Sequence, residues 1–167
     1  MSVSITFRWC SDLGIVTQAA DLYVRNIRPE YISNEMQVGP ANRWADDLSD
    51  AIHREMHEAV EHLRKTGHAK RKLALALQNE DLVACAIVEV FGDPISPYAS
   101  LDDLVVESTK QDLGIGTKCL SWIESECRSS KVRQLFLVSG QGNSRAHRFF
   151  RRQGFAPASI VMVKRIQ

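Results

Sequence analysis

The chain has 167 residues, of which 44% are hydrophobic, and its formal net charge at pH 7 is +1. This size predicts one domain, over residues 1–167, with enough apolar side chains for a substantial core. No apolar run approaches the roughly 18 residues that a membrane span needs, and the first residues lack the basic and apolar regions of a secretory signal. We therefore expect a cytoplasmic protein whose four scattered cysteines are reduced.

The near-neutral net charge hides an uneven distribution. All 20 acidic residues lie at or before Glu126, together with 12 Lys and Arg, whereas residues 127–167 carry 9 Lys and Arg and no acid. A basic C-terminal part could bind nucleic acid, but it lacks an aromatic stacking platform and a nucleic-acid motif. A basic nucleic-acid-binding module is therefore a distant alternative, while the acidic remainder favours a cationic substrate.

Apolar periodicity predicts the elements in chain order. Helices are expected at residues 13–27, 43–65, 117–128 and after Asn143. Strands are expected at residues 4–9, 72–77 and 82–90, in a segment ending at Val106, and at 132–138 and 159–166, with a tight turn at 79–81. The order β-α-α-β-β-β-α-β-α-β predicts an α/β fold, a mixed sheet with helices on both faces.

Residues 111–116, QDLGIG, lie between an expected strand and an expected helix. The first amides of a helix lack internal partners and carry partial positive charge, so they attract anions. Gly114 and Gly116 allow the backbone to approach a phosphate closely. Thr117 and Lys118 follow in the wrong order for a P-loop, and the third small position of a dinucleotide fingerprint is missing. The expected ligand is a phosphate carried by a larger molecule.

Two ordered motifs resemble those of the GNAT (general N-acetyltransferase) superfamily. Gln111, Gly114 and Gly116 match the acetyl-CoA signature [QR]-x-x-G-x-[GA], and residues 143–155 resemble the second motif, an N-x-x-A helix ending in (F/Y)-x-x-x-G-F. The resemblance implies a GNAT-like fold and acetyl-CoA as co-substrate. It implies direct transfer of the acetyl group, in a ternary complex, to a primary amine of a small molecule or peptide. The alternative is a GNAT-fold acyl-CoA-binding or regulatory protein without turnover.

The resemblance also implies roles for individual residues. Strand backbone groups pair with the pantetheine arm, loop amides cradle the pyrophosphate, and the motif asparagine contacts the pantetheine side. The implied cofactor-binding residues are Leu104, Val105, Val106, Gln111, Asp112, Leu113, Gly114, Ile115, Gly116, Thr117, Asn143 and Phe150. Phe150 stands where many family members have a tyrosine that protonates coenzyme A, and phenylalanine cannot donate a proton. Water, Ser144, Tyr31 or Tyr98 could substitute, or the thiolate leaves unassisted.

An attacking amine must first lose a proton, which for a pKa of 10.4 costs about 4.6 kcal/mol at pH 7. The expected catalytic residues are Asp102 and Asp103, which an alternating strand would place on opposite faces, so that only one faces the cleft. Complementing the substrate's charge or forming a surface pair is an equal alternative for either. The segment 29–44 is expected to shape the acceptor pocket, with Tyr31 and Glu35 as substrate-binding candidates.

Other chemistry has weaker support in the sequence. His53 and His57 are spaced i, i+4 beside Glu61, but H-R-E-M-H is not H-E-x-x-H, so no metal is expected. His147 is expected to be an exposed helix residue, and no cysteine has a nucleophile context. Neither a membrane nor a nucleic acid is expected as a partner. Monomer and homodimer stay open, as do antibiotic, polyamine, amino-acid and protein N-terminus acceptors.

Overall fold

A computed structural model describes residues 4–28, 31, 47–162 and 164. These residues belong to two compact units, one comprising Met1–Ile27 with Asp47–Val138 and the other comprising Arg28–Asp46 with Ser139–Gln167. Within the part of the chain that the structure describes, the first unit holds five strands and three α-helices, and the second holds α4 (Ser144–Arg152). One domain over residues 1–167 stays a prediction.

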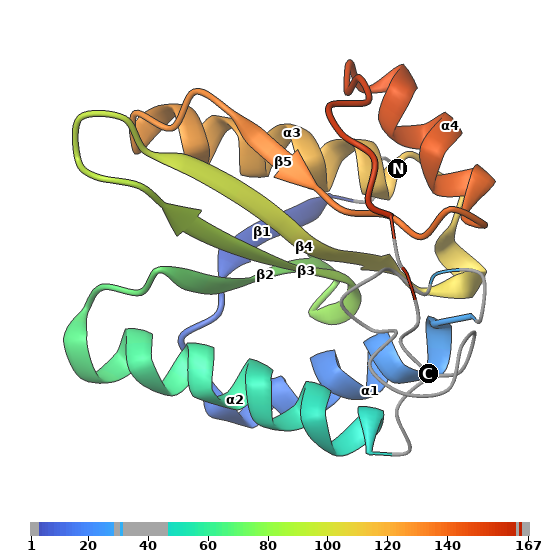
Figure 1. The fold of residues 1–167 in the computed structure, drawn as a ribbon. Helices are drawn as coiled ribbons and strands as arrows, with labels where there is room; N and C mark the ends of the chain where they lie inside the picture. Colours follow the sequence, from blue (N-terminus) through green and yellow to red (C-terminus); the bar gives the residue numbers. More distant parts are fainter. Residues whose placement is uncertain (1–3, 29–30, 32–46, 163, 165–167) are drawn as a thin grey trace. The chain divides into compact units, whose positions relative to one another are not determined.

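A five-stranded sheet forms the centre of the first unit (Figure 1). Its order is β1-β2-β3-β4-β5, with the first four strands antiparallel and β5 parallel to β4. The strands are β1 (Ile5–Trp9), β2 (Arg71–Gln78), β3 (Asp81–Phe91), β4 (Tyr98–Val106) and β5 (Leu135–Leu137). Asn79 and Glu80 have φ of 52° and 69° between β2 and β3, the left-handed geometry of a two-residue hairpin turn. The predicted turn at 79–81 is confirmed.

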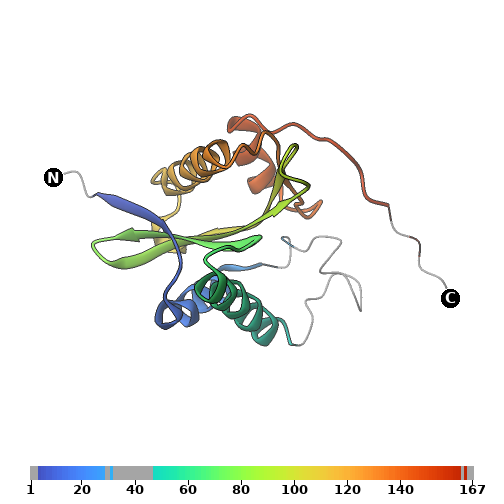
Figure 2. The same cartoon turned by 90° about the vertical axis from the view of Figure 1, so that its left-hand side faces the viewer.

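Helices cover both faces of this sheet, as predicted (Figure 2). On one face lie α1 (Val16–Asn26), which follows a 3-10 turn at Leu13–Ile15, and α2 (Leu48–Thr66). On the other face lies α3 (Ile115–Ser129), which connects β4 to the parallel strand β5. Such a crossover places the helix N-terminus at the carboxyl end of β4, where ligands of α/β folds commonly bind.

Apolar stripes explain why these helices pack where they do. Along α2, Ile52, Met56 and Val60 recur at i, i+4, i+8 and are buried against the α1 side of the sheet. On the opposite face, Leu120 and Ile123 of α3 are fully buried. The central strands β2 and β3 are therefore covered on both sides, which is why their sequences are almost continuously apolar.

Three predicted elements differ from the structure, one of them the strand expected at 132–138, which is confined to Leu135–Leu137. The strand expected at 159–166 is wrong for its described part, because residues 156–162 and 164 form no strand and Ile160 and Met162 are 88% and 90% exposed. Strand propensity reflects packing against a neighbour, and the run of β-branched residues is not enough by itself. The helix expected at 43–65 begins at Leu48 within the described residues; positions 43–46 lie outside them. No helix in the described ranges is long and apolar enough to cross a membrane.

Candidate active site

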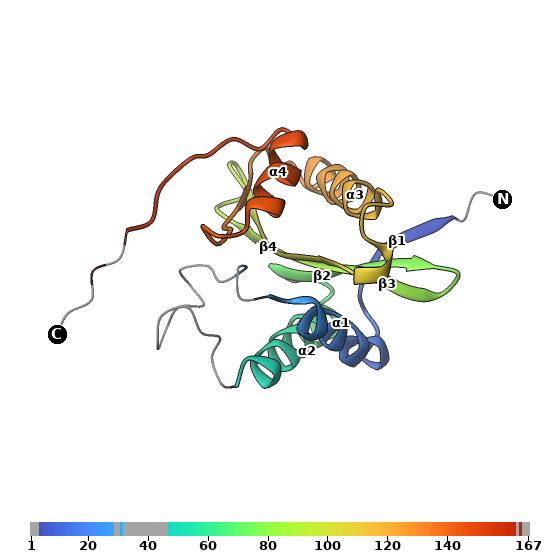
Figure 3. The same cartoon turned by 90° about the vertical axis from the view of Figure 1, so that its right-hand side faces the viewer.

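The carboxyl-terminal half of β4 has an open edge. β5 pairs with β4 only at Ala99, Ser100 and Leu101, so within the described residues the following part of β4, up to Val106, has no strand partner on that side. Backbone N–H and C=O groups along such an edge are available to an extended ligand. The edge ends where β4 turns toward α3 (Figure 3).

Successive residues along this edge point their backbone N–H and C=O groups to alternate sides of the strand. Glu107 donates its N–H to the Val83 carbonyl on β3 at 2.9 Å, so alternate residues of β4 direct their backbone groups toward β3. Val105 therefore faces β3, whereas Leu104 and Val106 direct their backbone groups toward the open edge. Of the three strand residues implied to contact a cofactor, these two have the required backbone direction.

A β-bulge lies at the start of the open edge. Ile87 of β3 pairs with Asp103 and Val88 pairs with Leu101, which leaves Asp102 as the extra residue in β4. A bulge interrupts the alternation of side chains and re-aims them. The expectation that Asp102 and Asp103 lie on opposite faces is therefore wrong: both carboxylates join one polar cluster with side chains from α1, α2 and β2.

Asp103 is the carboxylate of this cluster with an unusual proton affinity. The Tyr23 hydroxyl of α1 donates a hydrogen bond of 2.5 Å to its Oδ1. Burial raises the pKa of Asp103 to about 7, the Tyr23 hydrogen bond opposes that rise, and the charges of Glu55 and Asp102 add to it. A carboxylate with this pKa accepts and releases a proton near neutral pH, which is the requirement for a general base.

Asp102 is held differently, by an arginine. Nη2 of Arg71 lies 3.1 Å from Oδ2 of Asp102 and 2.8 Å from Oε2 of Glu89, and Nη1 contacts Glu55. Three carboxylates thus share one guanidinium, and Asp103 brings a fourth nearby. Burial raises the pKa of Glu55, with Arg71 opposing the rise. The cluster has more acidic than basic groups and therefore favours cations.

The loop after β4 has the backbone geometry of an anion site. Asp112 and Gly114 both have positive φ, 62° and 78°, while φ of Leu113 between them is not positive. Alternation of the sign of φ turns successive N–H groups toward the same side and forms a concave nest of donors. A Cβ built at Gly114 would meet no protein atom within 4 Å, so the space beside this residue is open.

α3 extends this donor surface. Its first internal bond runs from the Lys118 N–H to the Gly114 carbonyl at 3.0 Å, so the amides of Ile115 and Gly116 have no acceptor within the helix. Gly114 is the N-cap and has no side chain to cap them. Ile115 is 2% exposed and packs against Ala76 and Ala84, which fixes the helix N-terminus against the sheet.

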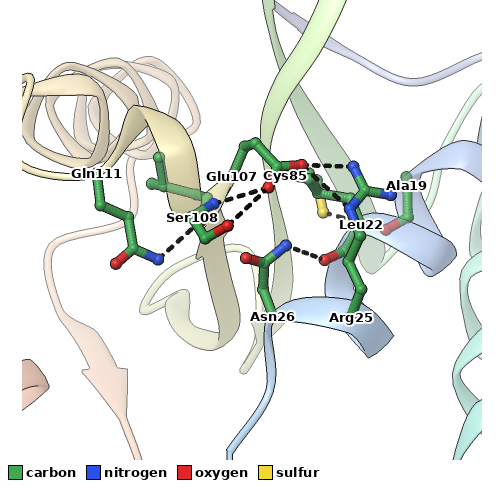
Figure 4. Close-up of polar contacts among 9 residues, drawn as sticks. Ala19, Leu22, Arg25, Asn26, Cys85, Glu107, Ser108 and Gln111 are labelled. Carbon is green, nitrogen blue, oxygen red and sulfur yellow. Dashed lines mark hydrogen bonds and ion pairs between the residues drawn. The ribbon is translucent and has the colours of Figure 1, made fainter.

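Gln111 closes the loop at its root. Its side-chain Nε2 donates to the Val106 carbonyl at 3.1 Å (Figure 4). The side chain therefore occupies one of the outward backbone acceptors of β4. Because this amide is engaged by the strand, the structure gives Gln111 a role in shaping the loop, alongside any contact with a ligand.

The second unit contains the other motif. Asn143 is the N-cap of α4, and its Oδ1 accepts from the Ala146 N–H at 3.1 Å, the capping alternative for this residue. Phe150 packs edge-on against Phe149 and Phe155, with ring centroids 5.0 and 5.4 Å away. Tyr31 is half-buried, with its N–H bonded to the Arg28 carbonyl. Glu35 lies outside the described residues.

Other candidates from the sequence are placed as follows. Tyr98 begins β4, eight residues from Val106, which corresponds to about 26 Å along a strand, so it is far from the phosphate end of the open edge. His53 Nε2 lies 3.0 Å from an Asp21 oxygen, and the described ranges contain no group of three or more side chains suited to a metal. All four cysteines are free and buried, and burial raises the pKa of each thiol.

Comparison with known proteins agrees with this geometry. The sequence profile described as "Acetyltransferase (GNAT) family" matches residues 37–155, which is more than half of the chain. The chain belongs to the acetyltransferase (GNAT) family. The GNAT-type resemblance drawn from the two motifs is therefore confirmed, and so is the fold class. No curated protein matches the sequence.

Solved structures share the GNAT fold at low sequence identity. The tetramutant of BH1408 from Bacillus halodurans is 17% identical, with a TM-score of 0.75 over 96% of this chain and 99% of that one. The aminoglycoside N-acetyltransferase AAC(6')-Iy in complex with CoA is 12% identical, with a TM-score of 0.69 over 100% and 97%. A ribosomal-protein-alanine N-acetyltransferase from Brucella melitensis biovar Abortus 2308 is 11% identical, with a TM-score of 0.67 over 98% and 100%.

Four residues of the polar cluster were not predicted from the sequence: Tyr23, Glu55, Arg71 and Glu89. Tyr23 falls in the apolar stripe of the first helix, and Arg71 is a strand residue beside a lysine. A buried tyrosine hydroxyl usually finds an acceptor, so a tyrosine in a core stripe and an aspartate in a central strand form a recognisable pair. Their pairing across 80 positions of sequence became visible only with the fold.

Proposed function

We propose that this GNAT protein transfers the acetyl group of acetyl-CoA directly to a primary amine, with Asp103 as the general base. The bulge at Asp102 supports this proposal most, because it brings Asp103, a carboxylate with a pKa of about 7, to the start of an open strand edge. The other end of the edge adjoins a nest of amide donors. One continuous path thus joins a phosphate site to a base.

The cofactor follows this path in the proposed complex. The pyrophosphate binds the amides between Asp112 and Thr117, and the pantetheine arm runs along the edge from Val106 toward Leu104. Three strand residues span about 10 Å, so the thioester end reaches the bulge next to Asp103. Both substrates are then held together, and proximity itself contributes to the rate.

Transfer then proceeds without a covalent enzyme intermediate. Asp103 accepts a proton from the acceptor ammonium, and the amine nitrogen attacks the thioester carbonyl. The C–S bond then breaks, coenzyme A leaves as the thiolate, and the nitrogen loses its second proton to water as the amide forms. Buried thiols with raised pKa values are poor nucleophiles, which supports direct transfer over a cysteine route. A thiol pKa of about 8.5 makes the thiolate a tolerable leaving group without the tyrosine that Phe150 replaces.

The acceptor in this proposal is a cationic amine. Glu55, Glu89 and Asp102 contact a single guanidinium and Asp103 lies nearby, so the cluster attracts positive charge before deprotonation. This favours small polyamines, amino sugars and basic peptides, which carry several positive charges, over monoamines that carry one. The structural relatives include one enzyme named for aminoglycosides and one named for a ribosomal protein.

Release of thiol from acetyl-CoA, measured against a panel of amines, tests this function. The wild type should release thiol only with an amine present, and kcat/KM should rise with pH around a midpoint near 7. Asp103→Asn should lower kcat about 100-fold or more and remove this rise. A protein that binds acetyl-CoA but acetylates no amine would instead be an acyl-CoA-binding or regulatory member of the family.

A further inference from the structure

The first residue after β4 is anchored by an unusually complete set of hydrogen bonds. Arg25 of α1 donates from Nε and Nη2 to Oε2 of Glu107, at 3.1 and 2.6 Å. Ser108 donates from its backbone N and its Oγ to Oε1, at 2.8 and 3.1 Å (Figure 4). Both oxygens of this carboxylate are therefore fixed, one to a helix and one to the turn that leads into the phosphate loop.

The turn itself is closed at both ends. Lys110 donates its N–H to the Glu107 carbonyl at 2.8 Å, and the Gln111 side chain returns to Val106 at 3.1 Å. The residues between β4 and the nest thus form one hydrogen-bonded link. Apart from the Gln111 bond back to β4, the side-chain bonds that join this link to another element, among those described here, are the two from Arg25 to Glu107.

Arg25 projects from a firmly held part of α1. The neighbouring Asn26 is 7% exposed and donates to the Leu22 carbonyl at 2.8 Å, which closes the last turn of the helix. One turn earlier, the Cys85 thiol of β3 lies 3.6 Å from the Ala19 carbonyl (Figure 4). Isolated surface ion pairs contribute little to stability. Here, however, two donors of Arg25 bond to the Glu107 carboxylate, whose side chain is only 21% exposed.

The charge of Glu107 also matters for an anion site. The hydrogen bonds from Arg25 lower the pKa of Glu107, so it is ionised at neutral pH. This negative charge stands five residues before the Asp112 amide that begins the nest. Arg25 neutralises it at the point where the chain turns toward the phosphates.

We infer that the Arg25–Glu107 pair is a positioning element for the phosphate loop and sets the affinity for the phosphate half of the cofactor. This inference rests on the proposed function, because it takes coenzyme A as the ligand of the loop. Among the described residues no hydrogen bond joins this pair to the base cluster, where Asp103 bonds to Tyr23 and Asp102 bonds to Arg71. Its loss should therefore weaken contacts with the diphosphate and leave contacts with the pantetheine arm intact.

The test compares coenzyme A with pantetheine, which lacks the phosphates, by titration of the wild type and three variants. Arg25→Met and Glu107→Gln break the pair from opposite ends and change the net charge in opposite directions. Arg128→Met is the matched control, because it removes an arginine with a 3.7 Å ion pair to Glu124 at the far end of α3. Thermal unfolding confirms that each variant is folded.

Both pair variants should bind coenzyme A about tenfold more weakly than the wild type, while pantetheine affinity stays within about twofold. Arg128→Met should match the wild type for both ligands. Equal losses for both ligands would show general loosening and overturn the inference. Weaker binding in Arg25→Met with tighter binding in Glu107→Gln would show a through-space charge effect, which also overturns it. Unchanged affinity for coenzyme A in both Arg25→Met and Glu107→Gln would also overturn the inference.

A wild type that binds neither ligand would give a different result. It would overturn the proposed function, and this inference with it. Failure of the inference alone therefore requires that the wild type bind coenzyme A and that the variants depart from the expected selectivity.

Discussion

The hydroxyl of Tyr23 and the carboxylate of Asp103 meet at 2.5 Å, although they lie on a helix and on a central strand 80 residues apart. Tyr23 is 5% exposed, so its hydroxyl depends on this acceptor. The bond orients the carboxylate and stabilises its charged form, which moderates the pKa rise that burial causes. One helix thus holds the proposed base through Tyr23 and the root of the phosphate loop through Arg25.

Tyr23→Phe tests the first of these contacts. Removing the hydroxyl takes away a hydrogen bond to the charged form, so the pKa of Asp103 should rise further. The ascending limb of kcat/KM should move to higher pH by about one unit, while kcat at high pH falls only a few-fold. A pH–rate profile measures the shift. An unmoved limb would mean that Asp103 is not the group that titrates.

Asp102→Asn should shift the same limb in the opposite direction. The negative charge of Asp102 raises the pKa of Asp103, and its removal leaves Arg71 with fewer anionic partners. The pKa of Asp103 should therefore fall, and activity should extend to lower pH. The pH–rate profiles of Tyr23→Phe and Asp102→Asn, compared with that of the wild type, show whether the two limbs move in opposite directions. If Asp102→Asn abolished turnover while Asp103→Asn did not, Asp102 would be the base.

Asp103→Asn should also stabilise the protein at alkaline pH. The folded pKa of about 7 lies above the ordinary aspartate value of about 3.9, so between these pH values the folded state binds more protons and wild-type stability falls as pH rises. Asparagine removes this penalty and can still accept the Tyr23 hydrogen bond. Thermal unfolding should show a higher Tm than the wild type at pH 8 and a smaller difference at pH 4.5. Equal differences at both pH values would contradict the raised pKa.

Gly114→Val tests the phosphate nest. Valine at a φ of 78° costs about 1–2 kcal/mol of stability, and its side chain would enter the open space beside the donor amides. Acetyl-CoA affinity should fall at least about tenfold. Gly67→Val is the control, because Gly67 has a φ of 70°, equally open surroundings and a place at the end of α2. Similar unfolding temperatures with unequal affinities are expected; equal affinities would remove the nest from the cofactor site.

The sequence predicted those parts of the fold that depend on local patterns. The stripe of Ile52, Met56 and Val60 predicted α2, and residues 111–114 of QDLGIG lie between strand and helix as expected, whereas Ile115 and Gly116 already belong to α3. These features depend on periodicity and turn chemistry within a few residues. The position of the bulge at Asp102 was not predicted, because a bulge is a mismatch between two strands and the sequence of one strand does not show it.

Only part of the candidate site could be predicted from the sequence, for the same reason. Both aspartates were named, but their shared cluster with Tyr23 and Arg71 depends on contacts between elements far apart in sequence. The tail at 159–162 shows the opposite error, since apolar β-branched residues predicted a strand where these residues pair with no other strand. In each case tertiary context decided what local sequence left open.

The most direct test of the account is calorimetric titration of the protein with acetyl-CoA, followed in the same sample by thiol release on addition of a polyamine or an amino sugar. Saturable binding with thiol release that requires the amine is the result predicted by a phosphate nest joined to a base at Asp103. If acetyl-CoA does not bind, the assignment of the loop and the proposed function are both contradicted.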